Sequence, residues 1–208
     1  VRLTGVRYHA QHVSTAGAVD LIAAAKKEGL PVTAEATPHH LLFDHSFAES
    51  IDSKYKMMPP LRTAEDVEAV RRGLRAGIID VVATDHAPHA DHEKDLAWEE
   101  TPFGVTGLEW AAAVVNTVVA LPPEDLFKVM SVIPAHIAGL QSQGRLEVGA
   151  PANLVVFDPG APTATDRTMS RSSNSPYLGR DLKGSVVHTV YRGQFTVRNA
   201  ELVTRAKE

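Results

Sequence analysis

The sequence contains no cysteine among its 208 residues, which excludes a disulfide framework and is typical of a protein of the reducing cytoplasm. It also lacks a basic excess: 21 Lys and Arg stand against 25 Asp and Glu for a net charge of -4, so we expect no nucleic-acid partner. No apolar stretch approaches the roughly 20 residues that a membrane span requires, and no signal-peptide pattern opens the chain. We therefore expect a cytoplasmic protein that acts on a small molecule and binds no membrane.

Two kinds of catalytic motif are missing as well. The sequence has no serine or cysteine nucleophile motif and no glycine-rich phosphate loop of recognised spacing. The stretch Gly-Arg-Leu-Glu-Val-Gly at 144–149 is a turn signal and not a phosphate cradle. The chain does contain histidine and aspartate at predicted strand ends, and these residues favour metal-assisted hydrolysis.

Strand and helix patterns alternate three times in the first part of the chain. Short apolar runs predict strands at residues 6–12, 31–36 and 78–83. Helical spacing and capping residues predict helices from Ser14 or Thr15 to Gly29, from Thr63 to Gly77, and around 108–120 and 122–140. Residues 37–62, rich in His, Ser and Pro, are predicted to form an extended functional loop. The alternation indicates parallel strands joined by helices.

The pattern changes near Gly144. Runs of β-branched residues at 152–158, 185–193 and 195–197 predict strands and hairpins, with a surface loop at 160–175. We predict two parts, a partial (β/α)8 barrel at 1–143 and a small β-sandwich segment at 144–208. Three βα units cannot close a barrel of eight. We therefore expect this α/β chain to be the carboxyl-terminal part, about strands six to eight, of a longer enzyme.

The most informative candidate site is Thr-Asp-His-Ala-Pro-His at residues 84–89, directly after the apolar run at 78–83. Asp85 is predicted to lie at the carboxyl end of a buried strand, where barrel enzymes carry their chemistry. A buried carboxylate is costly unless it is paired or binds a metal. The alternative is a carboxylate that only caps a backbone turn.

Histidines near two other strand ends are candidate partners of Asp85. His12 ends the first strand, and an imidazole from a nearby strand is a suitable co-ligand for zinc. His9 should point away from His12, because alternate strand residues face opposite sides of a sheet. His39 and His40 are adjacent, so their side chains should diverge, and we expect them to serve in loop packing or in hydrogen bonds that support a ligand.

Five motifs, in order, resemble the dihydroorotases of the amidohydrolase superfamily, in particular the bacterial type related to hydantoinases. They are His-Val-Ser-Thr at 12–15, Thr-Pro-His-His-Leu-Leu at 37–42, Pro-Pro-Leu-Arg at 59–62, Ala-Thr-Asp-His-Ala-Pro-His at 83–89 and Pro-Phe-Gly at 102–104. Residues 149–158 are similar to the β-sandwich tail of that superfamily. Five ordered motifs are far more specific than any one of them.

This resemblance implies a set of roles. His12 would be the metal-binding histidine of barrel strand six, and Asp85 the strand-eight aspartate that binds metal and shuttles a proton. His89 would help to hold the substrate carboxylate, the backbone of Phe103 and Gly104 would meet the ring, and His86 would not be a ligand. The implied reaction is the reversible conversion of (S)-dihydroorotate to N-carbamoyl-L-aspartate in pyrimidine biosynthesis, by a hydroxide bound at a binuclear Zn²⁺ centre.

The sequence departs from the family pattern in two respects. Met58 stands where the family usually has asparagine before Pro-Pro-Leu-Arg, which puts one polar substrate contact in doubt. The His-x-His pair of strand one, the bridging carboxylate of strand four and the histidine of strand five have no counterpart in the 208 residues. We therefore expect this chain alone to be inactive and to hold no complete metal centre.

Two other functions fit the same residues. The first is a related cyclic amidase that acts on hydantoin, dihydropyrimidine or allantoin, although such relatives tend to replace the histidine at the position of His89. The second is a non-catalytic, dihydroorotase-like partner that scaffolds aspartate transcarbamoylase, and the presence of both His12 and Asp85 argues against it. The expected assembly is a homodimer or a complex with aspartate transcarbamoylase.

Overall fold

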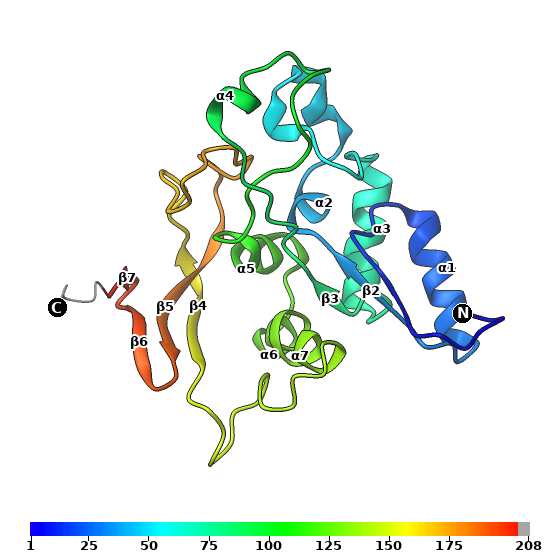
Figure 1. Ribbon diagram of the computed structural model, residues 1–208, viewed down its shortest axis with the longest axis vertical. Coiled ribbons are helices and arrows are strands. Elements are labelled where there is room, and N and C mark those ends of the chain that lie inside the picture. Colours follow the sequence, from blue (N-terminus) through cyan, green and yellow to red (C-terminus); the bar gives the residue numbers. More distant parts are fainter. Residues whose placement is uncertain (204–208) are drawn as a thin grey trace.

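The computed structural model describes residues 1–203 and contains two sheets (Figure 1). The first consists of β1 (Tyr8–Ala10), β2 (Val32–Ala36) and β3 (Val81–Val82), which pair in parallel in that order. Helices α1 (Ala16–Lys27) and α3 (Ala64–Arg75) connect the strands and pack against each other. The predicted alternation of helices and parallel strands is confirmed, although the strands are shorter than predicted.

Side-chain caps fix where both connecting helices begin. Thr15 Oγ1 accepts a hydrogen bond from the backbone amide three residues on (3.2 Å), and Thr63 Oγ1 accepts one from the Asp66 amide (3.3 Å). Such caps satisfy amides that have no partner within the helix. Asp66 Oδ1 also accepts from the backbone amide of Ala16 at 2.8 Å, which ties the start of α1 to the start of α3. Of the two predicted caps for the first helix, Thr15 is the one that the structure uses.

Residues 37–62 are not the extended loop that the sequence predicted, because they contain three short helical segments. These are α2 (Pro38–Leu42), η1 (His45–Ser50) and η2 (Ser53–Tyr55). Each begins after a side chain that accepts a hydrogen bond from the first turn, namely Thr37, Asp44 and Asp52. The polar residues that suggested a loop therefore act as helix caps.

The later helices are short segments that follow one another. They are α4 (Asp91–Lys94), α5 (Ala111–Val114), η3 (Val115–Val119), α6 (Pro123–Phe127), η4 (Lys128–Val132) and α7 (Ile133–Ile137). The runs 111–119 and 123–137 are continuous, so both predicted helices are present; the first ends in a wide π-type turn and the second contains one. Pro134 has no amide hydrogen and its ring crowds the carbonyl of Met130, which accounts for the wide turn before α7. Among residues 1–203 no helix has the length and apolar character needed to cross a bilayer.

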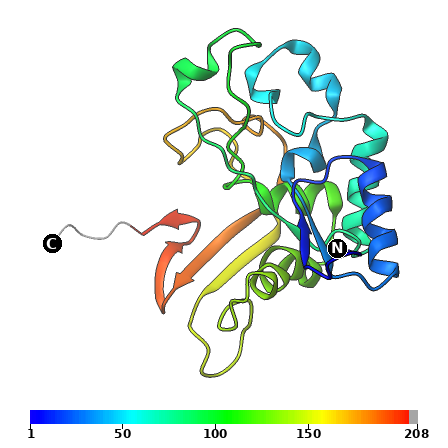
Figure 2. The ribbon, with the colours of Figure 1, turned by 45° about the vertical axis from the view of Figure 1, so that its right-hand side comes forward.

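The second sheet is antiparallel and extends away from the first (Figure 2). Its strands are β4 (Leu154–Pro162), β5 (Lys183–Tyr191), β6 (Gln194–Arg198) and β7 (Glu201–Leu202), in that order. Arg192 and Gly193 join β5 to β6 and have φ values of 51° and 79°. Positive φ at both positions is what a two-residue type I′ hairpin turn requires.

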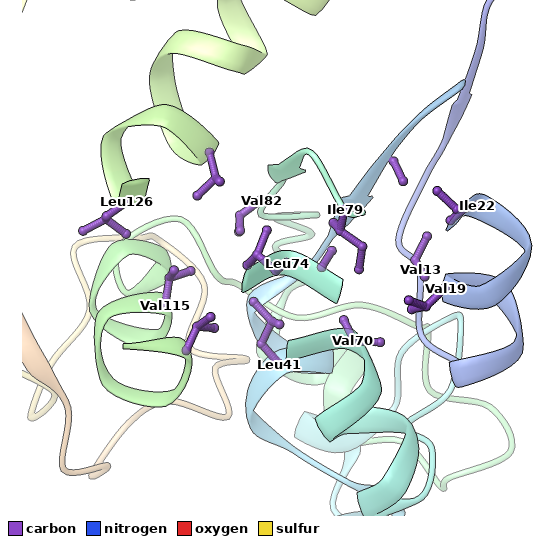
Figure 3. Close-up of a cluster of buried hydrophobic side chains, with 14 residues drawn as sticks. Val13, Val19, Ile22, Leu41, Val70, Leu74, Ile79, Val82, Val115 and Leu126 are labelled. Atoms are coloured by element: carbon purple, nitrogen blue, oxygen red, sulfur yellow. The ribbon is translucent and has the colours of Figure 1, made fainter. Parts of the chain in front are cut away.

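Two clusters of buried apolar side chains hold these elements together. The first packs the parallel sheet against α1, α3 and η3, with Val19, Val70 and Val115 among its members (Figure 3). The second joins the region after β3 to the connection between β4 and β5, where Trp110 and Tyr177 lie with ring centroids 5.9 Å apart. Burial of such large rings is a main source of stability in a core.

The connection between β4 and β5 differs from the predicted surface loop at 160–175. Residues 160–162 of the predicted loop belong to β4, and its last two residues, Asn174 and Ser175, are 3% and 1% exposed. The cause lies just beyond them, because Tyr177 and Leu182 enter the second cluster and carry the preceding backbone into the core. The polar composition of this segment therefore reflects buried hydrogen bonding as well as solvent exposure.

Candidate functional site

His12 and Asp85 follow the carboxyl ends of β1 and β3, the two strands that flank β2. Both backbones lie in the left-handed region, with φ of 38° at His12 and 48° at Asp85. Such conformations cost about 1–3 kcal/mol outside glycine and cluster at functional sites. Because the strands are parallel, both side chains leave the sheet at the same edge.

The strand end at His12 is held mainly by Glu35 of β2. The His12 amide donates to Glu35 Oε1 at 3.4 Å, and the His9 ring contacts Glu35 Oε2 (3.0 Å) and Thr33 Oγ1 (2.7 Å). His12 is half-buried and lines a cavity of about 350 Å³ together with Pro59. The His9 ring is thus engaged with β2, whereas His12 lines the cavity.

Asp85 is exposed, which differs from the buried strand end that the sequence predicted. Burial stops with β3, whose Val81 and Val82 are 4% and 7% exposed. Tyr177 lies close to Asp85, and its buried hydroxyl has no hydrogen-bond partner among the described residues. Burial raises the pKa of the Tyr177 hydroxyl above its usual range, and the Asp85 carboxylate raises it further. The Tyr177 phenol near Asp85 is therefore neutral. Because Asp85 is exposed, the cost of burying a carboxylate is not an argument for a metal at this position.

His86 supports the loop that follows it. Its Nδ1 accepts hydrogen bonds from the backbone amides of Gly107 and Leu108, both at 3.2 Å. The backbone of His86 also forms a parallel bridge with Val105. One ring nitrogen of His86 is therefore engaged by residues 107 and 108.

His89, Phe103 and Gly104, the three residues predicted to hold substrate, come together in the structure. His89 Nε2 lies 3.0 Å from the Phe103 carbonyl oxygen. Gly104 has φ of 114°, and a Cβ at this position would lie 2.6 Å from Ala87 Cβ and 3.4 Å from His89 Nε2. Only glycine fits here, because any side chain would push the two loops apart.

Three buried polar side chains hold the Phe103–Gly104 loop, and sequence reasoning missed all of them. The Lys56 ammonium donates to the carbonyls of Trp98, Glu99 (3.3 Å) and Thr101 (2.6 Å). The Lys94 ammonium donates to the carbonyls of Pro102 (2.9 Å) and Gly104 (3.2 Å). The third is the amide of Asn174. One signal was available, since Lys56 stands between Tyr55 and Met57 in an otherwise apolar stretch.

His39 and His40 do not diverge as predicted, because α2 brings their ring centroids within 4.4 Å. His40 Nδ1 contacts Thr37 Oγ1 at 2.7 Å, and His40 Nε2 contacts the Pro59 carbonyl at 2.9 Å. Burial is the main cause that lowers the pKa of His40 to about 4, and burial also lowers the pKa of His39 well below its usual value. Burial therefore favours the neutral form of both rings. The His40 ring ties α2 to the Pro59 segment, whereas neither ring nitrogen of His39 has a hydrogen-bond partner among the described residues.

The donor atoms at the two strand ends match zinc in kind. Zinc in proteins prefers imidazole nitrogen and carboxylate oxygen, and His12 and Asp85 supply one of each. Within residues 1–203 no three His, Asp or Glu side chains lie close enough together to hold an ion. Since a catalytic zinc takes three protein ligands, these two side chains fit such an ion in type but need further donors.

Residues 2–196 match the Amidohydrolase family. The dihydroorotase of Leifsonia xyli subsp. xyli is 48% identical over 200 residues, which are 93% of this chain and 46% of that protein. The dihydroorotase of Mycobacterium tuberculosis is 47% identical over 208 residues, covering 97% of this chain and 48% of that protein. The chain thus spans about half the length of these curated relatives.

Solved structures of hydantoinases have the same fold as this chain. The D-hydantoinase (dihydropyrimidinase) of Thermus sp. superposes with a TM-score of 0.91 at 28% identity, over 98% of this chain and 47% of that one. The L-hydantoinase (dihydropyrimidinase) of Arthrobacter aurescens gives a TM-score of 0.90 at 30% identity, again over 98% of this chain and 47% of that one.

Proposed function

We propose that this chain, which belongs to the amidohydrolase family, is the carboxyl-terminal part of a cytoplasmic dihydroorotase. The activity would be the reversible conversion of dihydroorotate to N-carbamoyl-L-aspartate. The observation that carries this proposal is the joining of His89, Phe103 and Gly104 beside the strand end of Asp85, in a chain whose relatives named dihydroorotase are 47–48% identical to it.

In this proposal the residues 1–143 supply about strands six to eight of a (β/α)8 barrel, and residues 144–208 supply a β-sandwich segment. The parallel order of β1, β2 and β3 is compatible with three consecutive barrel strands. The antiparallel sheet of β4 to β7 provides the separate segment. A homodimer, or a complex with aspartate transcarbamoylase, is the assembly that we propose.

His12 and Asp85 would hold zinc together with donors from outside this chain, and a binuclear centre is proposed. The chemistry that bound zinc supplies is polarisation of the amide carbonyl and activation of water. The Asp85 carboxylate accepts the proton of the attacking water and returns it to the ring nitrogen as the amide bond breaks. The exposure of Asp85 at a strand end leaves its oxygens accessible for this transfer.

Substrate recognition is assigned to the loop pair at residues 86–89 and 102–104. The contact between His89 Nε2 and the Phe103 carbonyl leaves Nδ1 directed away from it, with Glu93 Oε2 at 3.9 Å. His89 would bind the substrate carboxylate, and the backbone of Phe103 and Gly104 would bind the ring amide groups. The side chain of Met58 is 54% exposed and can cover the ring with apolar surface.

The deciding experiment measures hydrolysis of dihydroorotate by the full-length protein. Chelation should abolish it, and Asp85→Asn should lower kcat by at least about 100-fold, the contribution typical of a positioned acid or base. Asp95→Asn, which removes an exposed carboxylate nearby, is the matched control and should behave as wild type. Full activity of the Asp85→Asn protein would contradict the proposed mechanism.

A cyclic amidase is the second candidate, favoured by the fold shared with hydantoinases. Hydantoin and dihydrouracil lack the carboxylate of dihydroorotate, so a preference for them would assign His89 another role. Zinc analysis of the same preparation tests the remaining possibility of a scaffold without catalysis, which should purify without stoichiometric metal.

A further inference from the structure

Asn174 is a buried amide at the point where three segments of the chain meet. It lies in the connection between β4 and β5 and is 3% exposed. Two features fix the connection around it: Trp110 Nε1 donates to the Ala164 carbonyl (3.0 Å), and the ring of Tyr177 is fully buried. Asn174 therefore approaches the candidate site from the sheet region, on a well-anchored backbone.

The side chain of Asn174 bonds to both loops of the candidate site at once. Its Nδ2 donates to the carbonyl of Ala87 (3.0 Å) and to that of Gly104 (3.3 Å). Its Oδ1 accepts from the backbone amide of His89 (3.2 Å), and its backbone carbonyl accepts from Thr106 (3.1 Å). Both ends of the amide are thus used, and every partner belongs to the strand-end loop or to the Phe103–Gly104 loop.

We infer that Asn174 is a positioning residue, whose amide sets the distance and orientation between the His89 loop and the Phe103–Gly104 loop. The inference deepens the proposed function and rests on it for its kinetic consequence. Two loops that hold opposite parts of one substrate must keep a fixed spacing, because small misplacements at a binding site have large effects. Asn174 supplies that spacing without touching the substrate.

The partners of Asn174 demand an amide specifically. Two carbonyl oxygens need donors and one backbone N–H needs an acceptor, and among side chains of this length only asparagine offers both. A carboxylate in its place would accept from His89 but would face the carbonyls of Ala87 and Gly104 with no proton to donate. Buried polar groups left without partners are costly, so the loops would separate or admit water.

The test uses the full-length protein with Asn174→Asp and Asn174→Ala. Asn153→Asp is the matched control, because the half-buried Asn153 amide, directly before β4, also bridges two segments, donating to Gln143 (3.0 Å) and accepting from the Arg192 amide (2.8 Å). We expect both Asn174 variants to raise KM for dihydroorotate about tenfold, as loss of one well-made hydrogen bond can, with a smaller change in kcat. The control should leave both constants unchanged.

Two further readouts separate positioning from general damage. Amide hydrogen exchange should rise in residues 86–106 of the Asn174 variants and stay as in wild type within α3. In Asn174→Asp, protonation of the introduced carboxyl restores one donor, so the ratio of its KM to that of wild type should fall as the pH is lowered from about 8 to about 6, given the raised pKa of a buried acid.

The activity assay tests the proposed function, and hydrogen exchange tests the role of Asn174. If the wild-type protein does not hydrolyse dihydroorotate, the proposed function fails, and hydrogen exchange still tests Asn174. Unchanged exchange at 86–106 would overturn the inference, as would a rise of equal size in α3. An Asn174→Asp protein with wild-type KM would overturn it as well.

Discussion

The two strand ends that flank β2 carry the same backbone strain but receive very different support. At Asp85 the following loops are bonded by Lys56, Lys94 and Asn174, which come from three separate segments. At His12 the contacts come mainly from Glu35, whose carboxylate and carbonyl accept from the amides of residues 12 and 13. Three segments of the chain thus hold the loops at the Asp85 strand end, whereas β2 alone provides most contacts at the His12 strand end.

Contacts within this chain therefore fix the backbone around Asp85 more completely than the backbone around His12. A strained backbone persists where the surrounding structure over-determines it. That condition is met around Asp85, where the neighbouring loops make buried hydrogen bonds in several directions. His12 borders a cavity of about 350 Å³, so its geometry should depend more on whatever its ring binds.

The largest expected effect is a loss of zinc affinity when His12, at the weakly held strand end, is replaced. In the full-length protein, His12→Asn should lower zinc affinity by at least about 100-fold, because loss of an outer partner of a ligand alone costs 10- to 100-fold. His9→Asn is the control, since the His9 ring is engaged by Thr33 and Glu35. Competition with a chromophoric chelator measures both affinities, and equal zinc retention by the two variants would remove His12 from the metal site.

The same preparation tests the comparison directly. Removal of zinc should speed amide hydrogen exchange at residues 11–14 more than at residues 86–106, which are held by side chains of this chain. Faster exchange at 86–106 than at 11–14 would show that the two strand ends depend on the ligand in the opposite order.

The parts of the fold that sequence could predict are those decided by neighbours in the chain. Thr15 and Thr63 bond to amides three residues away, so each helix start is visible as a local pattern. The turn at 192–193 is equally local. Asp85 could be placed at a strand end from its own apolar run, whereas His89, Phe103 and Gly104 were grouped as a substrate site only by the resemblance of their motifs to the dihydroorotases.

The parts that could not be predicted depend on partners far away in sequence. Asn174 bonds to residues 70 to 87 positions earlier, and nothing in its Ser- and Thr-rich neighbourhood distinguishes it from a surface loop. His39 and His40 were expected to diverge because residues 37–62 were taken as a loop, and α2 changes their geometry. The exposure of Asp85 likewise follows from tertiary packing and not from its own apolar run.

The strongly held strand end should lose stability when one of its lysines is replaced. Lys56→Met leaves the carbonyls of Trp98, Glu99 and Thr101 without their buried donor. We expect the free energy of unfolding to fall by about 1.5–3 kcal/mol, the range for hydrogen bonds made by a charged group. Lys54→Met, on an exposed lysine two residues away, should change it by less than about 0.5 kcal/mol. Urea denaturation measures both, and equal midpoints for the two variants would show that the Lys56 ammonium does not stabilise the loop.

The smallest effect is a pH dependence of stability that arises from Lys94. Burial, followed by the charge of Lys56, lowers the pKa of Lys94 to about 8, whereas an unfolded lysine titrates near 10.4. Between these values the unfolded state binds more protons than the folded state, so this group makes stability rise with pH. The difference in urea midpoint between wild type and Lys94→Met should therefore shift in favour of wild type from about pH 8 to about pH 10 and stay flat below pH 8. Lys54→Met provides the baseline for general alkaline effects, and a shift in favour of Lys94→Met would mean that the Lys94 ammonium is stabilised in the folded protein and that its loop is held by charge.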